Sequence, residues 1–290
     1  MANELGATEL AAVVQELWRK TVLAAKYSVA VHDRVAFTDL QEVSKKGDIA
    51  HLPIFPRFST NAVSSAGAVT NQSITLTDTT ITVDQWREAT VELVDRQGWQ
   101  STFGDSASLA REFAKNFGPR LAEYIDNDIF GLHGSITTNT VGDTGSPNPM
   151  SLPLARAALQ LLDENRVPKT DRNFVFSPKA FWEVFGNDQI ALAYAIGGNK
   201  SVVVSGPEAA PQLYGAKWYE SPEIATSGTA PNVVDKNLLL HKQTIGLIMQ
   251  KNFSITQFAK IALTTRICGD VLYGRAVIRE EHGCVINTKS

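Results

Sequence analysis

The feature that most limits the possible folds is a long apolar stripe over residues 105–132. Bulky apolar side chains recur there at every fourth position, at Leu109, Phe113, Phe117, Leu121, Ile125 and Ile129. That spacing is typical of one face of an α-helix, and Asp105 and Ser106 precede it as capping residues. The pattern predicts a helix of about seven turns that lies against a sheet or another subunit.

Pro119 falls inside this predicted helix. A proline removes one backbone donor and crowds the carbonyl group four residues earlier, here that of Lys115. The sequence therefore predicts a bend between Lys115 and Pro119 or a break into two helices. In the second case Pro119 would be a first-turn residue after a break at Gly118.

The composition indicates a globular chain in which neither sign of charge dominates. The 290 residues are 43% hydrophobic and carry a net charge of −3, so a sizeable core is possible. A broad attraction to nucleic acid or to an anionic membrane is not expected. We find no apolar run of membrane-spanning length and no signal-peptide pattern, so no membrane partner is expected. Cys268 and Cys284 are expected to be free thiols.

Residues 46–100 show no helical periodicity in their apolar residues. Alternating apolar and polar residues over 73–83 and 89–94 predict the strands of a long antiparallel excursion. Its middle, residues 59–70, has almost no bulky side chain, so we expect a loop tip ordered by a neighbouring subunit. The predicted subunit-contact residues are Arg57, Phe58, Ser59, Thr60, Asn61, Thr70 and Asn71.

The rest of the chain alternates between helical and strand patterns. Residues 8–34 predict an amphipathic helical arm, and a polar loop over 134–150 marks a boundary between two lobes. Residues 152–165 predict a helix, residues 173–176 a buried strand, and Ser177 the cap of a further helix. Later strands are expected at 212–219, 238–241, 254–263, 271–279 and 283–287. We expect the last two to lie in the sheet beside the long helix.

We find no pattern of catalytic, cofactor-binding or metal-binding residues. The five histidines lack metal-ligand spacing, and neither a nucleophile elbow nor a phosphate-binding loop occurs. Glu123, Asp126 and Asp128 cluster on the long helix, where two carboxylates could act as acid and base. The favoured interpretation is a solvated or subunit-contacting helix face. We therefore predict a chain that is not an enzyme, with no cofactor and no metal.

The order of these segments resembles the major capsid proteins of tailed bacteriophages, which have the Hong Kong 97-type fold. The resemblance is carried by five pieces, KGDIAHLP at 46–53, LTDTTITVDQW at 76–86, VP with RNFVFSP within 167–178, YGAKWYESP at 214–222 and YGRAV at 273–277. Each piece is weak alone. Their order and spacing over nearly the whole chain make the resemblance specific.

This resemblance implies an α+β fold with an N-terminal arm (1–45) and an extended β loop (46–100). It also implies a peripheral domain with a spine helix (101–149 and 265–290) and an axial α/β domain (150–264). The implied function is that of a structural subunit of an icosahedral shell, self-assembling into pentamers and hexamers around packaged double-stranded DNA without sequence-specific binding. Pro119 would then adjust the curvature of the shell.

The implied partners are other copies of the chain, a separate scaffolding protein, a portal and decoration proteins. The implied location is the virion, after assembly in the host cytoplasm. Two alternatives remain open from the sequence. The first is an encapsulin-like nanocompartment shell with the same fold, and the second is a soluble α/β enzyme with an unrecognised site.

Overall fold

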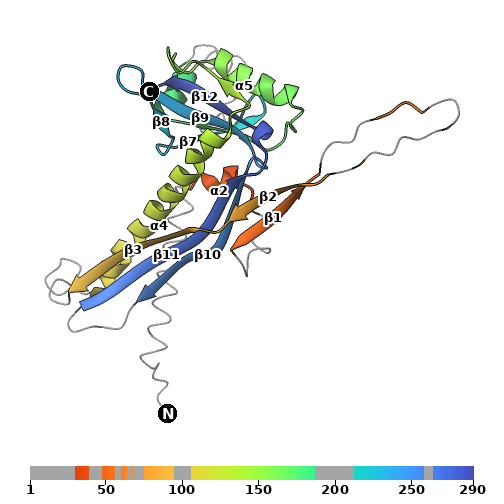
Figure 1. The fold of residues 1–290 in the computed structure, drawn as a ribbon. Helices are drawn as coiled ribbons and strands as arrows, with labels where there is room; N and C mark the ends of the chain where they lie inside the picture. The colour runs from red at the N-terminus through yellow and green to blue at the C-terminus, as the bar shows by residue number, and fades with distance from the viewer. Residues whose placement is uncertain are drawn as a thin grey trace, which may run out of the picture.

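Figure 1 shows the fold in a computed structural model of the chain. The structure describes residues 30–38, 48–55, 60–63, 67, 73, 75–94, 106–186, 212–257 and 264–290. The described helices are α2 (His32–Val35), α4 (Ser106–Phe130), α5 (Leu152–Glu164) and α6 (Pro178–Phe185), with 3-10 turns η2 (Gly131–Ser135) and η4 (Glu280–His282). The strands are β1 (Ile49–Ile54), β2 (Thr77–Thr82), β3 (Gln85–Val94), β4 (Thr140–Val141), β5 (Arg172–Phe176), β6 (Gln212–Leu213), β7 (Ala216–Glu220), β8 (Thr226–Ser227), β9 (Val234–His241), β10 (Ile245–Gln257), β11 (Thr264–Val277) and β12 (Gly283–Lys289).

The long helix α4 runs along an antiparallel three-stranded sheet in the order β10-β11-β3 (Figure 1). Its predicted apolar stripe is confirmed over residues 116–130. Phe117, Leu121, Ile125 and Ile129 are buried there in one core with Val271 and Tyr273 of β11. Burial of this face supplies most of the stability of such a helix.

Helix α4 is continuous through Pro119, so the predicted break after Gly118 is wrong. Phe117 and Leu121 pack into the core on both sides of the proline. Their burial outweighs the loss of one intrahelical hydrogen bond, because each large side chain contributes about 1.5–3 kcal/mol when fully buried.

The second sheet has seven strands in the order β4-β12-β9-β5-β7-β6, with β8 beside β9. It packs with α5 and α6 around a separate core that contains Phe174, Phe176 and Trp218. Three predictions are confirmed here. Helix α5 matches 152–165, every residue of β5 is buried, and the Ser177 hydroxyl caps α6 by accepting a hydrogen bond from the Ala180 N–H at 3.3 Å.

Several strand predictions need correction. The expected strand at 212–219 is a hairpin of β6 and β7, because Tyr214 and Gly215 adopt positive φ angles of 51° and 82° and turn the chain. Strand β10 begins at Ile245 rather than at residue 254. Of the last two strands, only β11 lies beside α4, whereas β12 pairs with β9 and β4 in the other sheet.

Other expectations fall partly outside the described residues. Of the predicted helical arm over 8–34, the described part contains only α2. The polar loop over 134–150 contains the short strand β4, which was not predicted. Cys268 and Cys284 are free and buried, as expected, and they lie in different sheets. Within the described ranges, no helix combines the length and apolar character needed to cross a membrane.

Candidate assembly surface

Strands β1 and β2 form a two-stranded antiparallel ribbon that leaves the body of the chain (Figure 1). Its register runs from the pair Ile49 and Thr82 at the base to the pair Ile54 and Thr77 at the far end. Only Ala50 and Ile81 of these strands are buried, and both lie near the base. The base of the predicted antiparallel excursion is therefore confirmed, and the described part of the chain leaves most of the ribbon surface uncovered.

The base of the ribbon lies directly against β10 and β11. A Cβ atom at Gly274 of β11 would lie 2.4 Å from the Thr82 carbonyl oxygen, and one at Gly246 of β10 would lie 2.6 Å from the Ile81 side chain. At Gly274 the neighbouring atoms are backbone, so the approach requires glycine there, whereas at Gly246 a side chain would displace the end of the Ile81 side chain. Ala50, Ile81 and Ile248 then close a small apolar cluster that fixes the ribbon at its root.

The two faces of the ribbon differ because successive side chains in a strand point to opposite sides. One face carries Ala50 and the half-buried Leu52 and Ile54, and of these Ala50 and Leu52 pack in an apolar cluster with Ile248 of β10. The opposite face is exposed along its whole length. We call this opposite face the outer ribbon face, and its members are Ile49, His51, Pro53, Phe55, Leu76, Asp78, Thr80 and Thr82.

The outer ribbon face combines large apolar side chains with one polar contact, between His51 and Asp78. Ile49, Phe55 and Leu76 have exposed fractions of 54%, 65% and 50%. Phe55 directly follows β1 and Leu76 directly precedes β2. They are therefore the next two residues beyond the last registered pair, Ile54 and Thr77. His51 Nδ1 lies 2.6 Å from Asp78 Oδ2 between these apolar groups. Exposed apolar side chains flanked by polar groups are typical of a protein-contact surface.

Of the predicted subunit-contact residues, the structure describes only Thr60 and Asn61, and both are exposed. Arg57, Phe58, Ser59, Thr70 and Asn71 lie outside the described residues. Sequence reasoning missed Ile49, Phe55 and Leu76. The available signal was that both alternating faces of residues 49–55 are largely apolar, which is typical of a strand covered on both sides.

A second exposed aromatic side chain, Trp86, lies on β3 just after the ribbon. It is 71% exposed, yet its indole N–H donates to Asp270 Oδ2 at 3.1 Å. The amine of Lys251, at 2.5 Å, and the hydroxyl of Ser254 donate to the same carboxylate. Burial raises the pKa of Asp270, but these three hydrogen bonds outweigh burial and leave the pKa below its usual value. Asp270 therefore holds Trp86 in a fixed, solvent-facing position, which lowers the entropy cost of a contact through it.

The three carboxylates that cluster near the C-terminal end of α4 do not form an acid–base pair, because each has a different structural partner. Glu123 accepts from Arg120 at 2.9 Å on the exposed side of the helix. Asp126 is buried and accepts from the backbone N–H groups of Val31 and His32. Asp128 accepts from the Tyr273 hydroxyl at 2.6 Å and pairs with Arg275 at 3.0 Å. Burial and the Asp128 carboxylate together raise the pKa of Tyr273.

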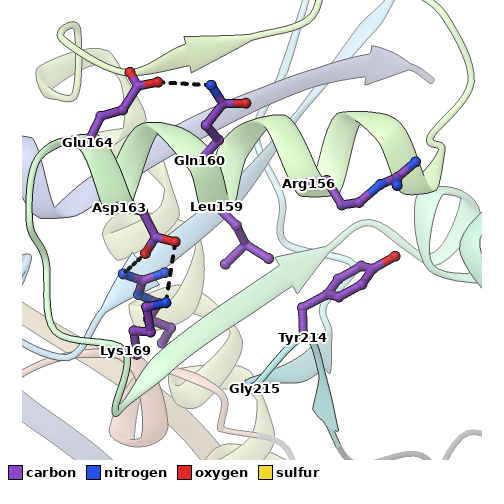
Figure 2. A pocket seen from close by; sticks show the side chains of 9 residues that line it. Arg156, Leu159, Gln160, Asp163, Glu164, Lys169, Tyr214 and Gly215 are labelled. Carbon is purple, nitrogen blue, oxygen red and sulfur yellow. Dashed lines mark hydrogen bonds and ion pairs between the residues drawn. The ribbon is translucent and has the colours of Figure 1, made fainter.

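A pocket of about 640 Å³ lies between α5 and the turn that joins β6 to β7 (Figure 2). Most of its charged groups are paired with one another. Arg172 donates to Asp163 at 2.6 Å, Lys169 lies 3.8 Å from the same carboxylate, and Gln160 donates to Glu164 at 2.9 Å. Among the residues that the structure covers, no group of three or more His, Cys, Asp or Glu side chains could hold a metal ion.

Comparison with known proteins gives matches in structure but not in sequence. No protein-family model matches the chain, and no curated protein sequence matches it. A structure of Mycobacterium phage Che8 matches with a TM-score of 0.69 and 17% identity, covering 89% of this chain and 90% of that chain. The capsid of Cyanophage P-SCSP1u matches with a TM-score of 0.68 and 15% identity, covering 90% and 89%.

The chain has the fold of a phage capsid subunit. The predicted α+β Hong Kong 97-type architecture is thus confirmed. A virus-like particle from Pyrococcus furiosus has the same fold, with a TM-score of 0.56 and 10% identity over 94% of this chain and 98% of that chain. Among the described residues that belong to neither of the two larger sheets nor their helices, the largest exposed apolar side chains lie on the outer ribbon face.

Proposed function

We propose that this chain is a structural subunit of an icosahedral viral shell, whose copies assemble into pentamers and hexamers around packaged double-stranded DNA. The observation that carries the proposal is the β1–β2 ribbon, which projects from a capsid fold and exposes Ile49, Phe55 and Leu76. The mixed surface charge and the likeness to capsid structures support a structural rather than an enzymatic role.

Physical reasoning favours another copy of the chain as the partner of the ribbon. A two-stranded ribbon is at best marginally stable in water, because each strand buries too little surface to offset the entropy of ordering it. A neighbouring subunit would cover the outer ribbon face and supply the missing burial. In this proposal the loop-tip residues Arg57 to Asn71 continue the same contact beyond the described strands.

The two sheets correspond to the two lobes of the proposed subunit. The peripheral lobe would hold α4 with β3, β10 and β11, and the axial lobe would hold the seven-stranded sheet with α5 and α6. Compared with the boundaries expected at residues 150, 264 and 265, this assignment moves β10 to the peripheral lobe and β12 to the axial lobe. The arm (1–45) and the extended loop (46–100) keep their proposed roles.

The proposal includes partners and a location in addition to self-assembly. A scaffolding protein and a portal would guide assembly in the host cytoplasm, decoration proteins would bind the outside, and the finished shell would be part of the virion. An encapsulin-like compartment is the second candidate. It would have the same fold as the viral shell subunit, and the matched capsid structures favour it less.

The decisive experiment is negative-stain electron microscopy of the purified full-length chain, followed by analysis of particles from the native host. Closed shells are the expected result, and double-stranded DNA inside the native particles would identify a viral shell. Native shells that contain a protein cargo and no DNA would favour the compartment. A chain that stays monomeric under all assembly conditions would contradict both candidates.

A further inference from the structure

The pocket between α5 and the β6–β7 turn has the size of a ligand site. Its volume is about 640 Å³, and small-molecule sites in proteins range over about 300–1,000 Å³. One wall is a single face of α5, because the lining residues of the helix occupy positions i, i+3, i+4, i+7 and i+8. They are Arg156, Leu159, Gln160, Asp163 and Glu164. Tyr214 and Gly215 of the turn form the opposite wall (Figure 2).

At one end of the pocket the charges neutralise one another. Arg172, which is 4% exposed, donates to Asp163 at 2.6 Å and to two backbone carbonyl oxygens at 2.7 and 2.9 Å. Lys169 lies 3.8 Å from the same carboxylate, and Glu164 accepts from Gln160 at 2.9 Å. Two cations and two carboxylates therefore balance here, and none of them requires a ligand as its partner.

Arg156 is the cation of the lining that lies outside this network. It precedes Asp163 by two helical turns, about 10 Å along the axis of α5. Within the described ranges, its guanidinium group makes no hydrogen bond or ion pair. Figure 2 shows Arg156 and Tyr214 at the end of the pocket away from Asp163, with Leu159 between the two ends. The lining therefore carries one excess positive charge, and it lies on Arg156.

Tyr214 has a conformation that its side chain disfavours. Tyr214 and Gly215 form a two-residue turn, because Leu213 and Ala216 on either side are paired with each other. Both turn residues have positive φ angles, 51° and 82°. The first position of such a turn favours Asn, Asp or Gly, since a larger side chain crowds the backbone in the left-handed region.

The tyrosine ring gains little from its own chain in return. It is 52% exposed, so burial offsets only part of the cost of this conformation. A strained residue whose side chain lines a pocket is a sign of a functional contact. An exposed arginine by itself needs no partner other than water. The strained aromatic ring in the same pocket favours a ligand that contacts both.

We propose that this pocket binds a small organic carboxylate with an apolar body. The Arg156 guanidinium would donate paired hydrogen bonds to the carboxylate, and the Tyr214 hydroxyl would donate a third. The apolar body would lie over Leu159 and against the tyrosine ring. One free guanidinium matches the single charge of a carboxylate, whereas a phosphate dianion would leave one charge uncompensated near Asp163 and Glu164.

A ligand held in this way would join α5 to the edge of the seven-stranded sheet, where β6 is the last strand. It would therefore stabilise the β6–β7 hairpin against local opening. All of the lining groups belong to one chain, so binding does not depend on shell assembly. Failure to bind and failure to assemble are separate outcomes for this protein.

Saturation-transfer NMR of the full-length chain with 3-phenylpropionate at neutral pH tests the proposal. A saturable signal with a dissociation constant on the order of 1 mM is expected for a ligand of this size. The neutral 3-phenylpropionamide lacks the charge, and acetate lacks the apolar body. Each should bind at least about tenfold more weakly. Bound 3-phenylpropionate should also slow amide exchange at the β6–β7 turn.

Two variants and one control make the outcome specific. Arg156→Gln should weaken binding of 3-phenylpropionate about tenfold or more, because it removes the charged donor. Lys179→Gln removes an exposed cation on α6, outside the pocket, and should leave binding unchanged. Tyr214→Asn should also weaken binding. It places a favoured residue at the positive φ angle, so the melting temperature should stay the same or rise.

Several results would overturn the proposal. These are no saturable binding of 3-phenylpropionate to the parent chain, equal binding of the amide, or unchanged binding in Arg156→Gln. A lower melting temperature of Tyr214→Asn with unchanged binding would assign the ring to the turn and not to a ligand. Should Arg156→Gln fold poorly, the comparison of 3-phenylpropionate with its amide on the parent chain still decides the role of the charge.

Discussion

The Asp126 carboxylate accepts a hydrogen bond from the His32 backbone N–H at 2.9 Å, joining positions 94 residues apart. It also accepts from the Val31 N–H at 3.1 Å and from the His32 ring. The N-cap position of α2 is Val31, whose side chain cannot cap a helix, so a carboxylate on α4 satisfies the first N–H groups of α2 instead. Asp126 thereby fixes α2 to the long helix.

Asp126→Ala should lower the free energy of unfolding by about 3 kcal/mol, because it leaves buried donors without an acceptor. The matched control is Glu123→Ala on the same helix, where the exposed pair with Arg120 should contribute about 0.5 kcal/mol or less. Denaturant titration of unassembled subunits measures both values. Similar losses in the two variants would contradict the anchoring role of Asp126.

Gly274→Ala should destabilise the subunit by about 2–3 kcal/mol, since the new methyl group would meet the Thr82 backbone and force the ribbon root away from β11. Gly131→Ala is the control, because a Cβ atom there meets nothing within 4 Å. The loss of protection against amide exchange should be greatest in β1 and β2. If Gly274→Ala were as stable as the control, the close approach at the ribbon root would not be a constraint.

The double variant Phe55→Asp and Leu76→Asp should prevent or distort shell assembly while the isolated subunit keeps its melting temperature, because both side chains are largely exposed in the free chain. Thr80→Asp adds a charge to the same outer ribbon face without removing an apolar group and should assemble far better. Electron microscopy and thermal melting give the two readouts. Normal shells from the double variant would show that this face is not a subunit contact.

Glu280 should make a pH-dependent contribution to stability. Its Oε1 accepts from the N–H and hydroxyl groups of both Thr137 and Thr138, each at 2.7 Å, and these bonds lower its pKa from 4.5 to about 2. Because the folded-state pKa is depressed, the contribution is fully present above pH 4.5 and is lost as the pH falls toward 2.

Glu280→Gln should therefore lower the unfolding free energy at neutral pH by about 1 kcal/mol or less, because solvent screens this surface site. The difference from the parent chain should shrink below pH 4.5. Urea titrations at several pH values measure it, with Glu281→Gln on the same turn as a control. A difference that stays constant down to pH 2.5 would refute the assignment.

Pro119→Ala should give an isolated subunit at least as stable as the parent, because alanine restores a helical donor at a position inside a continuous helix and is favoured by up to about 3 kcal/mol there. If Pro119 adjusts the curvature of the shell, particles of this variant should differ in size, shape or yield. Thermal melting of subunits and particle diameters by electron microscopy form the paired measurement. Unchanged particles would exclude the curvature role.

Local patterns in the sequence were sufficient to predict most individual elements. The four-residue spacing of Phe117, Leu121, Ile125 and Ile129 predicted the buried face of α4, and Ser177 with Pro178 predicted the start of α6. Such signals can be read without the fold because helix periodicity and capping depend on residues within one or two turns. The order of short motifs then indicated the fold class, which the structural comparison confirmed.

Partnerships between distant residues were decided only by the tertiary structure. The capping of α2 by Asp126, the passage of β2 over Gly246 and Gly274, and the placement of β12 in the second sheet depend on which surfaces meet in three dimensions. The continuity of α4 through Pro119 was also decided by tertiary packing. The proline removes a helical hydrogen bond locally, but the helix continues because the flanking side chains are buried against β11. The sequence by itself determined the local periodicity, the caps and the unusual polarity of the loop tip. Only the packed structure decided the strand register, the sheet to which each strand belongs and the exposed apolar face of the ribbon. These features depend on contacts between segments that are far apart in the chain.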